Sequence, residues 1–201
     1  MPPKAKYTRE EIVRIALDLV AEQGISALNA RSLGAALGTS TRPVFTAFKN
    51  MGELLTEVRA AAMERFNTFV NTNVIQPPFK NVGMKMVLFA AEQPKLFQLL
   101  YMSENEQNQE FDGIFSELGE NSEKCIEYIM RDYQMSRDDA MRLFRSVWLY
   151  TFGIGVMIAS KVCRFDENKI SDMLSQQFFA VIRFIKSGSP DNSMIAQPVT
   201  N

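Results

Sequence analysis

With 201 residues, 46% of them hydrophobic, the chain can form a sizeable core, so disorder is not the expected state. The net charge of −1 gives no indication of a nucleic-acid partner, yet residues 1–50 hold seven Lys and Arg against four Asp and Glu, a modest surplus that can also arise by chance. The absence of histidine rules out imidazole zinc sites and Ser-His or Cys-His catalysis, and two cysteines make neither a disulfide framework nor a metal site.

The N-terminal segment predicts a helix that begins next to Thr8. The residues before it are polar and contain no apolar run, so a secretory signal is not expected. Thr8 and Glu11 have the spacing of a capping box, in which each side chain bonds to the backbone of the other residue. Apolar residues then recur at helical spacing, and Gly24 is a natural stop.

Two short helices are expected next. Asn29 is placed to cap a helix that ends at Gly38, and Ser40 or Thr41 is placed to cap a third helix that buries Val44. Three short helices with a glycine in the turn between the second and third are typical of a helix-turn-helix. An ordinary small helical bundle would explain short amphipathic helices equally well.

The outer face of the third helix carries a mixed set of side chains. Hydroxyls, a guanidinium and apolar groups are suited to contact base edges, thymine methyls and phosphates. The residues on this face are Thr41, Arg42, Pro43, Phe45 and Thr46.

The rest of the chain is also expected to be helical. Strand alternation bounded by hairpin turns is absent, and prolines and polar stretches separate the helical segments. A proline pair at 77–78 is expected to break the chain between two helices. The expected helices span about 52–74, 82–93, 94–102, 110–133, 136–164 and 166–186.

No segment is long and apolar enough to predict a membrane span. The longest uncharged apolar stretch, residues 146–160, falls short of the roughly 20 residues that a span needs, and it contains two glycines. The sequence therefore predicts a cytoplasmic, reduced protein with no membrane association.

Residues 38–55 resemble the signature of the tetracycline-repressor (TetR) family. The family pattern is Gly-Val-Ser-x-x-x-Leu-Tyr-x-x-Phe-x-x-Lys-x-x-Leu, and the glycine, the serine, both aromatic positions and the closing leucine keep their spacing in this chain. The resemblance extends back to Ile12 and Gly24 and covers about the first 60 residues. Beyond them, only the helical character of the chain is similar to the family.

The resemblance implies an all-α fold of about nine helices. It places a three-helix helix-turn-helix DNA-binding domain at 1–51, a larger helical ligand-binding and dimerisation domain at 52–187, and a flexible tail at 188–201. It implies a transcriptional regulator rather than an enzyme, most simply a repressor that a small apolar or amphipathic effector releases from a pseudo-palindromic operator in double-stranded DNA. No cofactor, metal site or catalytic residue is expected.

The resemblance also implies which side chains contact DNA. Phe45 stands where the family usually has a tyrosine that contacts a phosphate, and Met51 stands where a lysine usually does, so Lys49 is the expected backbone contact in their place. Arg31 could instead be a solvated or ion-paired arginine, and Phe45 could simply pack. The expected DNA-binding residues are Arg31, Ser40, Thr41, Arg42, Pro43, Phe45, Thr46 and Lys49.

A ligand pocket in the C-terminal half is implied by the resemblance. The chain holds 12 Met and 15 Phe, most of them in this half, and such side chains adapt to apolar ligands or simply fill a core. Residues 148–153 resemble a Trp-x-x-x-His-Gly stretch of the family in which Phe152 replaces the histidine, which argues against a polar or metal-linked contact there. The expected lining residues are Phe89, Phe97, Tyr101, Phe115, Trp148 and Phe152.

The final two helices carry apolar residues on more than one face. This exceeds what one core contact needs, and in the family the corresponding helices pair across a two-fold axis. A homodimer interface is therefore expected at about 147–158 and 174–185, with Gly153 and Gly155 permitting close helix approach. Burial of these residues within one chain is the alternative.

Two other function classes are open from the sequence. A helical protein-binding scaffold would have no DNA role, but it leaves the motif at residues 40–55 unexplained. An all-helical enzyme would need paired carboxylates such as Glu104, Glu106 and Glu110, but these lie in a polar stretch typical of solvated side chains.

Overall fold

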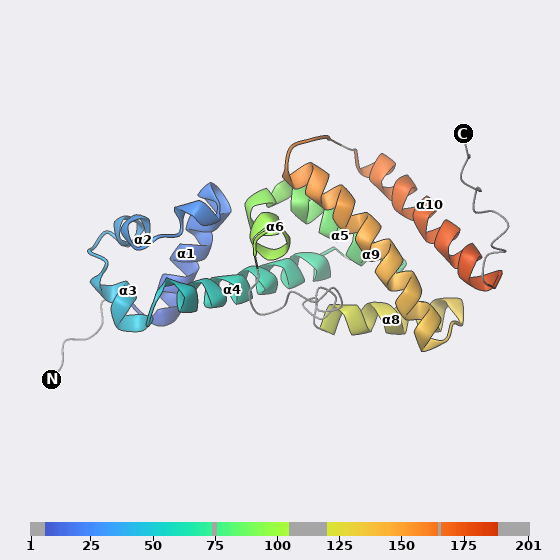
Figure 1. Ribbon diagram of the computed structural model, residues 1–201, viewed down its shortest axis with the longest axis horizontal. Helices are drawn as coiled ribbons and strands as arrows, with labels where there is room; N and C mark the ends of the chain where they lie inside the picture. The colour runs from blue at the N-terminus through green and yellow to red at the C-terminus, as the bar shows by residue number, and fades with distance from the viewer. Residues whose placement is uncertain (1–6, 74–75, 105–119, 165, 189–201) are drawn as a thin grey trace, which may run out of the picture.

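The computed structural model describes residues 7–73, 76–104, 120–164 and 166–188 of the chain. Within these ranges the regular structure consists of nine α-helices and one short 3-10 helix, with no strand, which confirms the all-α expectation. The molecule is elongated, with α1–α3 at one end and α10 at the other (Figure 1). Residues 189–201, expected as a flexible tail, lie outside the described ranges.

Short helices form the N-terminal end of the molecule, which we call the head. The first and third of these elements, at 9–23 and 30–36, start at the predicted capping residues, whereas the last, at 42–47, starts after Thr41 without the side-chain cap bond that was expected. The Glu11 N–H donates to Thr8 Oγ1, the Thr8 N–H donates to Glu11 Oε2 at 2.8 Å, and the Ser32 N–H donates to Asn29 Oδ1 at 3.0 Å. The head consists of α1 (Arg9–Gln23), η1 (Ile25–Ala27), α2 (Ala30–Ala36) and α3 (Arg42–Ala47).

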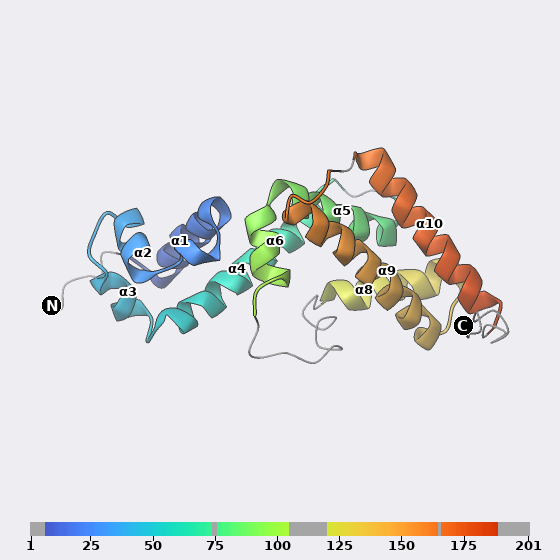
Figure 2. The same cartoon turned by 45° about the horizontal axis from the view of Figure 1, so that its top comes forward.

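The long helix α4 leads from the head to the remaining helices, which we call the body (Figure 2). It begins under a cap in which the Glu53 N–H donates to Asn50 Oδ1 at 2.9 Å. The body is a bundle in which α9 packs against α5, α6, α8 and α10. The bounds are α4 (Met51–Asn71), α5 (Pro78–Glu92), α6 (Pro94–Tyr101), α8 (Glu120–Tyr133), α9 (Arg137–Ala159) and α10 (Glu167–Lys186).

Two helix ends differ from the sequence-based expectation. Helix α5 begins at Pro78 rather than near residue 82, because proline at the first helical position removes an N–H that has no intrahelical partner anyway. Helix α9 ends at Ala159 rather than near residue 164, since Lys161 has a positive φ of 59° that no α-helix accommodates. Of the helix expected at 110–133, residues 110–119 lie outside the described ranges.

The head and the body share one hydrophobic core. Buried residues run in a continuous cluster from Ile12 in α1 through Phe66 in α4 to Ile182 in α10. Helix α1 packs against both α4 and α6, and a Cβ at Gly24 would lie 3.4 Å from Cδ of Lys95. The end of α1 therefore rests against the side chains of α6.

Close packing also joins α6 to α9. A Cβ at Gly155 would lie 2.7 Å from the ring of Phe97, whereas a Cβ at Gly153 would meet nothing within 4 Å. Gly155 therefore serves helix approach inside the chain, and Gly153 leaves an open position on α9. Among the described residues, no helix combines the length and apolar character that a membrane crossing needs.

Candidate nucleic-acid interface and ligand cavity

The turn between α2 and α3 is closed by two backbone hydrogen bonds. The Thr39 N–H donates to the Gly34 carbonyl and the Gly38 N–H to the Ala35 carbonyl, both at 3.0 Å, which is the Schellman pattern at a helix C-terminus. Gly38 adopts the positive φ of 61° that this closure requires, a conformation that glycine reaches without strain. The chain therefore leaves α2 in one defined direction.

Gly34 lets the turn fold back onto α2. A Cβ at Gly34 would lie 3.2 Å from the Thr39 carbonyl oxygen and 3.3 Å from the carbonyl carbon of Ser40, closer than most side chains are tolerated next to backbone. At the other side of the turn, the Tyr7 hydroxyl donates to the Leu37 carbonyl. These contacts fix the angle between α2 and α3.

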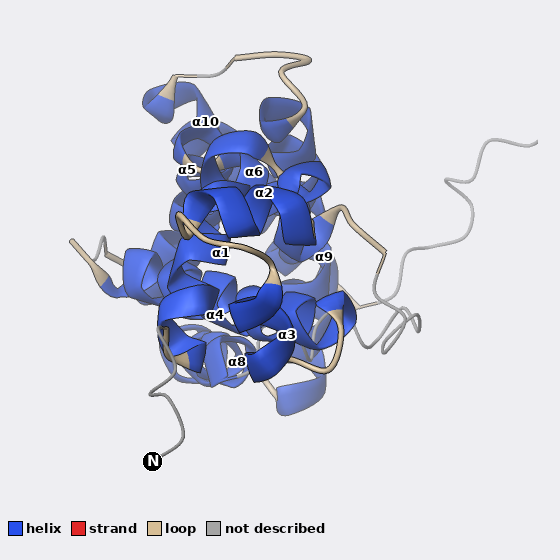
Figure 3. Ribbon diagram, turned by 90° about the vertical axis from the view of Figure 1, so that its left-hand side faces the viewer, coloured by secondary structure: helices blue, strands red, loops and turns tan. Residues whose placement is uncertain are grey.

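Helix α3 presents a half-apolar face at the end of the molecule. It buries Val44 completely, while the neighbouring Phe45 is 52% exposed. Thr46 is also exposed, and its Oγ1 donates to the Arg42 carbonyl at 2.9 Å. Thr41 and Pro43 are half-buried at the start of the helix. Figure 3 shows α2 and α3 together on this face.

The remaining expected contacts lie around this face. Arg31 on α2, Ser40 in the turn, and Arg42 and Lys49 at either end of α3 are all exposed. The ion pairs formed among the described residues involve other cations than Arg31, Arg42 and Lys49. Three positive side chains are thus free to meet an anion at this end of the molecule.

Arg9 takes no part in that exposed charge. Its guanidinium donates at 2.8 Å to the Ala47 carbonyl, to Glu53 Oε1 and to Glu57 Oε1, and lies 4.3 Å from the ring centroid of Phe48. Arg9 therefore holds α1, the end of α3 and the first turns of α4 together. We call this arrangement the Arg9 clamp.

The Arg9 clamp shifts the pKa values of both the arginine and a glutamate. The pKa of Glu53 is lowered, first by the backbone N–H of Lys49, which donates to it at 2.7 Å, and then by Arg9. The pKa of Arg9 is raised by its hydrogen bonds to the two glutamates. The basic surplus of residues 1–50 counts Arg9, but both of its partners lie beyond residue 50. The i, i+4 spacing of these glutamates on α4 is the sequence signal that could have indicated a clamp.

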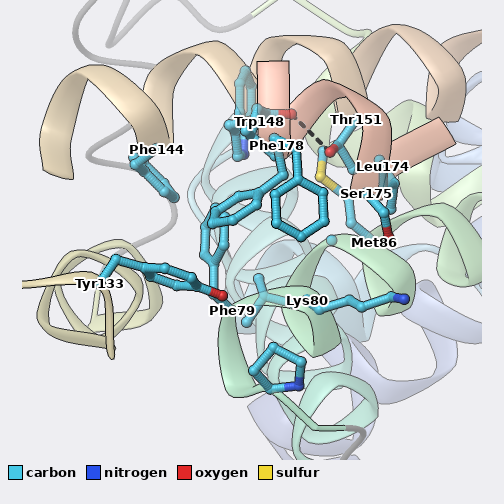
Figure 4. Close-up of a pocket in the computed structure, with 15 residues that line it drawn as sticks. Phe79, Lys80, Met86, Tyr133, Phe144, Trp148, Thr151, Leu174, Ser175 and Phe178 are labelled. Atoms are coloured by element: carbon cyan, nitrogen blue, oxygen red, sulfur yellow. Dashed lines mark hydrogen bonds between the residues drawn. The ribbon is translucent and has the colours of Figure 1, made fainter. Parts of the chain in front are cut away.

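A cavity of about 270 Å³ opens in the body between α5, α8, α9 and α10 (Figure 4). Its walls are mainly aromatic and aliphatic, and the aromatic rings are in mutual contact. Tyr133 and Phe178 have ring centroids 4.9 Å apart, and Phe79 and Phe178 5.8 Å apart. The lining comprises Pro77, Phe79, Lys80, Val82, Gly83, Met86, Tyr133, Phe144, Val147, Trp148, Thr151, Leu174, Ser175, Phe178 and Phe179.

Few polar groups face this cavity. Thr151 Oγ1 donates to the Val147 carbonyl at 2.8 Å and Ser175 Oγ to the Ser171 carbonyl at 2.7 Å, so both hydroxyl protons are used within their own helices. The pKa of Tyr133 is raised by partial burial and, secondarily, by the nearby negative charge of Asp132.

Most of the residues expected from the sequence to line a ligand pocket do not line this cavity, but pack behind its wall. Trp148 lines the cavity and stacks on Phe152, with centroids 5.2 Å apart. Phe152 and Tyr101 both contact Phe97, which lies 5.0 Å from Tyr101. Phe89 packs instead on Phe66, at 5.2 Å, and Phe115 lies outside the described residues.

Most of the residues that line the cavity were not expected from the sequence. Phe79, Tyr133 and Phe178 come from three helices far apart in the chain, and no local motif marks them as neighbours. Phe144 and Val147 on α9 could have been found by helical spacing, since they share the Trp148 face of that helix.

The outer faces of α9 and α10 remain partly apolar in the single chain. Phe178, by contrast, is only 9% exposed and packs inside the chain. The large apolar side chains exposed on the two helices are Leu149 (39%), Met157 (37%), Phe179 (58%) and Phe184 (44%).

The candidate metal-ligating and catalytic carboxylates lie only partly among the described residues. The described residues contain no cluster of three or more Cys, Asp or Glu side chains that could hold a metal ion. Of the three glutamates considered for an enzyme, Glu104 is exposed, and Glu106 and Glu110 lie outside the described ranges.

Comparison with known proteins identifies the fold. The structure is similar to that of a TetR-like transcriptional regulator from Rhodococcus sp. RHA1, with a TM-score of 0.61 and 14% identity over 91% of this chain and 99% of that chain. It is also similar to the multidrug binding protein EbrR, solved in complex with imidazole, with a TM-score of 0.55 and 15% identity over 84% of this chain and 93% of that chain. No protein-family model and no curated protein matches the sequence. The chain therefore has the TetR-like all-helical fold.

Proposed function

From this fold we propose that the chain is a non-enzymatic, ligand-responsive transcriptional regulator that binds double-stranded operator DNA as a homodimer in the cytoplasm. The observation that carries the proposal is the head itself. A closed helix-turn-helix exposes Arg31, Arg42 and Lys49 without ion-pair partners among the described residues, next to the exposed Phe45 and Thr46. Side chains of these kinds match phosphates, base edges and thymine methyls in a major groove.

We assign the head, residues 1–51, to DNA binding and residues 52–187 to ligand binding and dimerisation. The apolar side chains exposed on α9 and α10 are the proposed dimer face, since a second copy would remove them from water. A symmetric dimer of this kind would present two α3 helices to successive major grooves, and its operator would be pseudo-palindromic.

Repression that a ligand relieves requires the cavity to influence the head. The cavity walls include α5 and α9, α9 rests on the Phe97 ring of α6 through Gly155, and Lys95 of α6 lies against the end of α1. A ligand that separates α5 from α9 would act on the head through α6 and, in a dimer, on the distance between the two heads. By linkage, such a ligand weakens DNA binding by the same factor as DNA weakens ligand binding.

The test is selection of duplexes from a random library, followed by titrations on the selected site and its single-base variants at several salt concentrations. We expect Arg42→Ala to weaken binding and to relax preference at one base pair of each half-site by about 1–3 kcal/mol. Lys49→Ala should weaken all sequences alike and make the log–log salt slope shallower by about one unit per half-site.

The outcomes separate the candidate functions. Uniform loss of affinity on every variant would make Arg42 a backbone contact rather than a reader of bases. Absence of any enriched duplex, together with no salt-dependent affinity for DNA, would contradict the proposal and favour a helical protein-binding scaffold.

A further inference from the structure

We propose that the ligand of the body cavity is an amphipathic carboxylate, with an aromatic or aliphatic body held by the rings and its anionic group held by Lys80. The inference deepens the proposed function, because it names the chemical class of the effector. The supporting observations concern the charge of the lining, the position of Lys80, and the size of the cavity.

The charge on the described lining of the cavity is positive. Among the fifteen described lining residues, Lys80 is the one with a charged side chain. Two acids lie near the cavity without lining it: Asp172 of α10 borders a separate groove, and Asp132, whose charge acts on Tyr133, forms an ion pair with Arg131. A lipophilic cation would therefore enter an apolar site that offers it a like charge and no carboxylate.

Lys80 is a donor without a competing partner. No hydrogen bond or ion pair occupies its amine among the described residues, and its side chain is half-buried. The hydroxyl protons of Thr151 and Ser175 are committed to their own helices. The amine is thus the charged donor at the cavity, beside the neutral hydroxyl of Tyr133, and charge-assisted bonds to a carboxylate are among the strongest that proteins form.

The start of α5 adds to this preference. Phe79 and Lys80 line the cavity in the first turn of a helix that no side chain caps, and Pro77 lines it just before that turn. Because proline has no N–H, the N–H groups of Phe79 and Lys80 carry the positive end of this helix, which favours an anion over a cation.

The cavity is polarised along its length. In Figure 4 the Lys80 amine lies on the side of Ser175 and Leu174, and the rings of Tyr133 and Phe144 lie on the opposite side. The volume of about 270 Å³ is near the lower end of the roughly 300–1,000 Å³ typical of ligand pockets, so a bicyclic or medium-chain body fits.

The test compares three probes with one apolar body: 2-naphthoate, 2-naphthalenemethanol and 2-naphthylmethylammonium, titrated calorimetrically into the full-length protein at neutral pH. We expect the carboxylate to bind about tenfold more tightly than the alcohol, as one half-buried charge-assisted bond would give, and the ammonium to bind most weakly.

Two variants on α5 identify the source of the difference. Lys80→Met should bring the carboxylate to the affinity of the alcohol. Lys85→Met should preserve the difference, since it removes the same charge from a side chain that lies 5.0 Å from the ring of Phe69 and outside the cavity lining. Thermal denaturation of each variant checks that it is folded.

Equal binding of the three probes, preference for the ammonium, no binding of any probe, or a carboxylate preference that survives Lys80→Met would each overturn the inference. A carboxylate preference that depends on Lys80 but leaves operator affinity unchanged would support the ligand class and contradict the proposed release from DNA.

Discussion

The head and the body hold their candidate functional residues in different ways. In the head, the exposed side chains of α3 are positioned by backbone closure of a short turn around Gly34 and Gly38 and by the Arg9 clamp. In the body, the cavity is the space left between side chains of four helices. A change in the head should therefore act through local geometry, whereas a change in the body should act through volume and packing.

The largest expected effect tests the packing of the body. Phe97 is fully buried between α6 and α9, and Phe97→Ala should lower the free energy of unfolding by about 3–5 kcal/mol. Phe45→Ala, at an exposed ring of α3 outside the proposed dimer face, should cost far less under the same chemical denaturation. Similar losses for the two variants would mean that the aromatic cluster behind the cavity is not a tight core.

The next effect concerns the outer face of the body. Phe184→Glu should place an unpaired charge in the proposed dimer interface and raise the dimer dissociation constant about a hundredfold or more in sedimentation equilibrium. Phe184→Leu keeps the position apolar and should leave the dimer intact. The Phe178 position is unsuitable for this purpose, because its side chain packs inside the chain. A wild-type protein that is monomeric at micromolar concentration would contradict the proposed homodimer.

The turn between α2 and α3 should be disrupted by a side chain at Gly34. Gly34→Val would bring new carbon atoms against the backbone of Thr39 and Ser40, at a cost of about 1–3 kcal/mol, and should abolish sequence-specific DNA binding. Ala35→Val introduces the same side chain at an exposed neighbouring position of α2 and should reduce stability by no more than its helix propensity, about 0.5 kcal/mol. Full DNA binding by Gly34→Val would show that the angle between α2 and α3 does not matter.

The difference between the head and the body explains which features could be predicted from the sequence alone. Thr8, Asn29 and Gly38 act within a few residues of themselves, so capping and turn rules placed the starts of α1 and α2 and the end of α2 correctly, although the expected side-chain cap of α3 does not form. Among the expected lining residues that the structure describes, Trp148 alone reaches the cavity, because the other walls are assembled by contacts between distant helices. Periodicity identifies the buried side of each helix, but it does not say which buried side chains leave space between them.

Arg9 shows that the same limit of sequence-based prediction applies inside the head. Charge counting assigned it to a basic DNA-facing end, whereas its partners Glu53 and Glu57 on α4 neutralise it. A long-range contact thus removed one cation from the expected surface and turned it into part of the link between head and body.

The smallest expected effect is the pH dependence of that link. The pKa of Glu53 is lowered in the folded protein by the Lys49 N–H and by Arg9, so its unfolded form binds a proton more readily than its folded form. The stability that Glu53 contributes is therefore fully present above its unfolded pKa of about 4.3 and is lost as the pH falls through the lower folded value.

Unfolding free energies measured from pH 7 down to pH 3 should accordingly fall more steeply for the wild type than for Glu53→Gln, with the difference confined to the acid side of about pH 4.3. Arg9→Met should flatten the profile only in part, because the backbone N–H of Lys49 remains the larger cause of the lowered pKa. Glu10→Gln is the control for a carboxyl whose lowered pKa does not depend mainly on Arg9, since the pKa of Glu10 is lowered first by its own backbone and by Thr8, with Arg9 a smaller cause. If Glu53→Gln left the acid limb unchanged, Glu53 would be a first-turn residue of α4 without a role in tying the head to the body, and the Arg9–Glu57 ion pair and the packing of α1 on α4 and α6 would join the two regions.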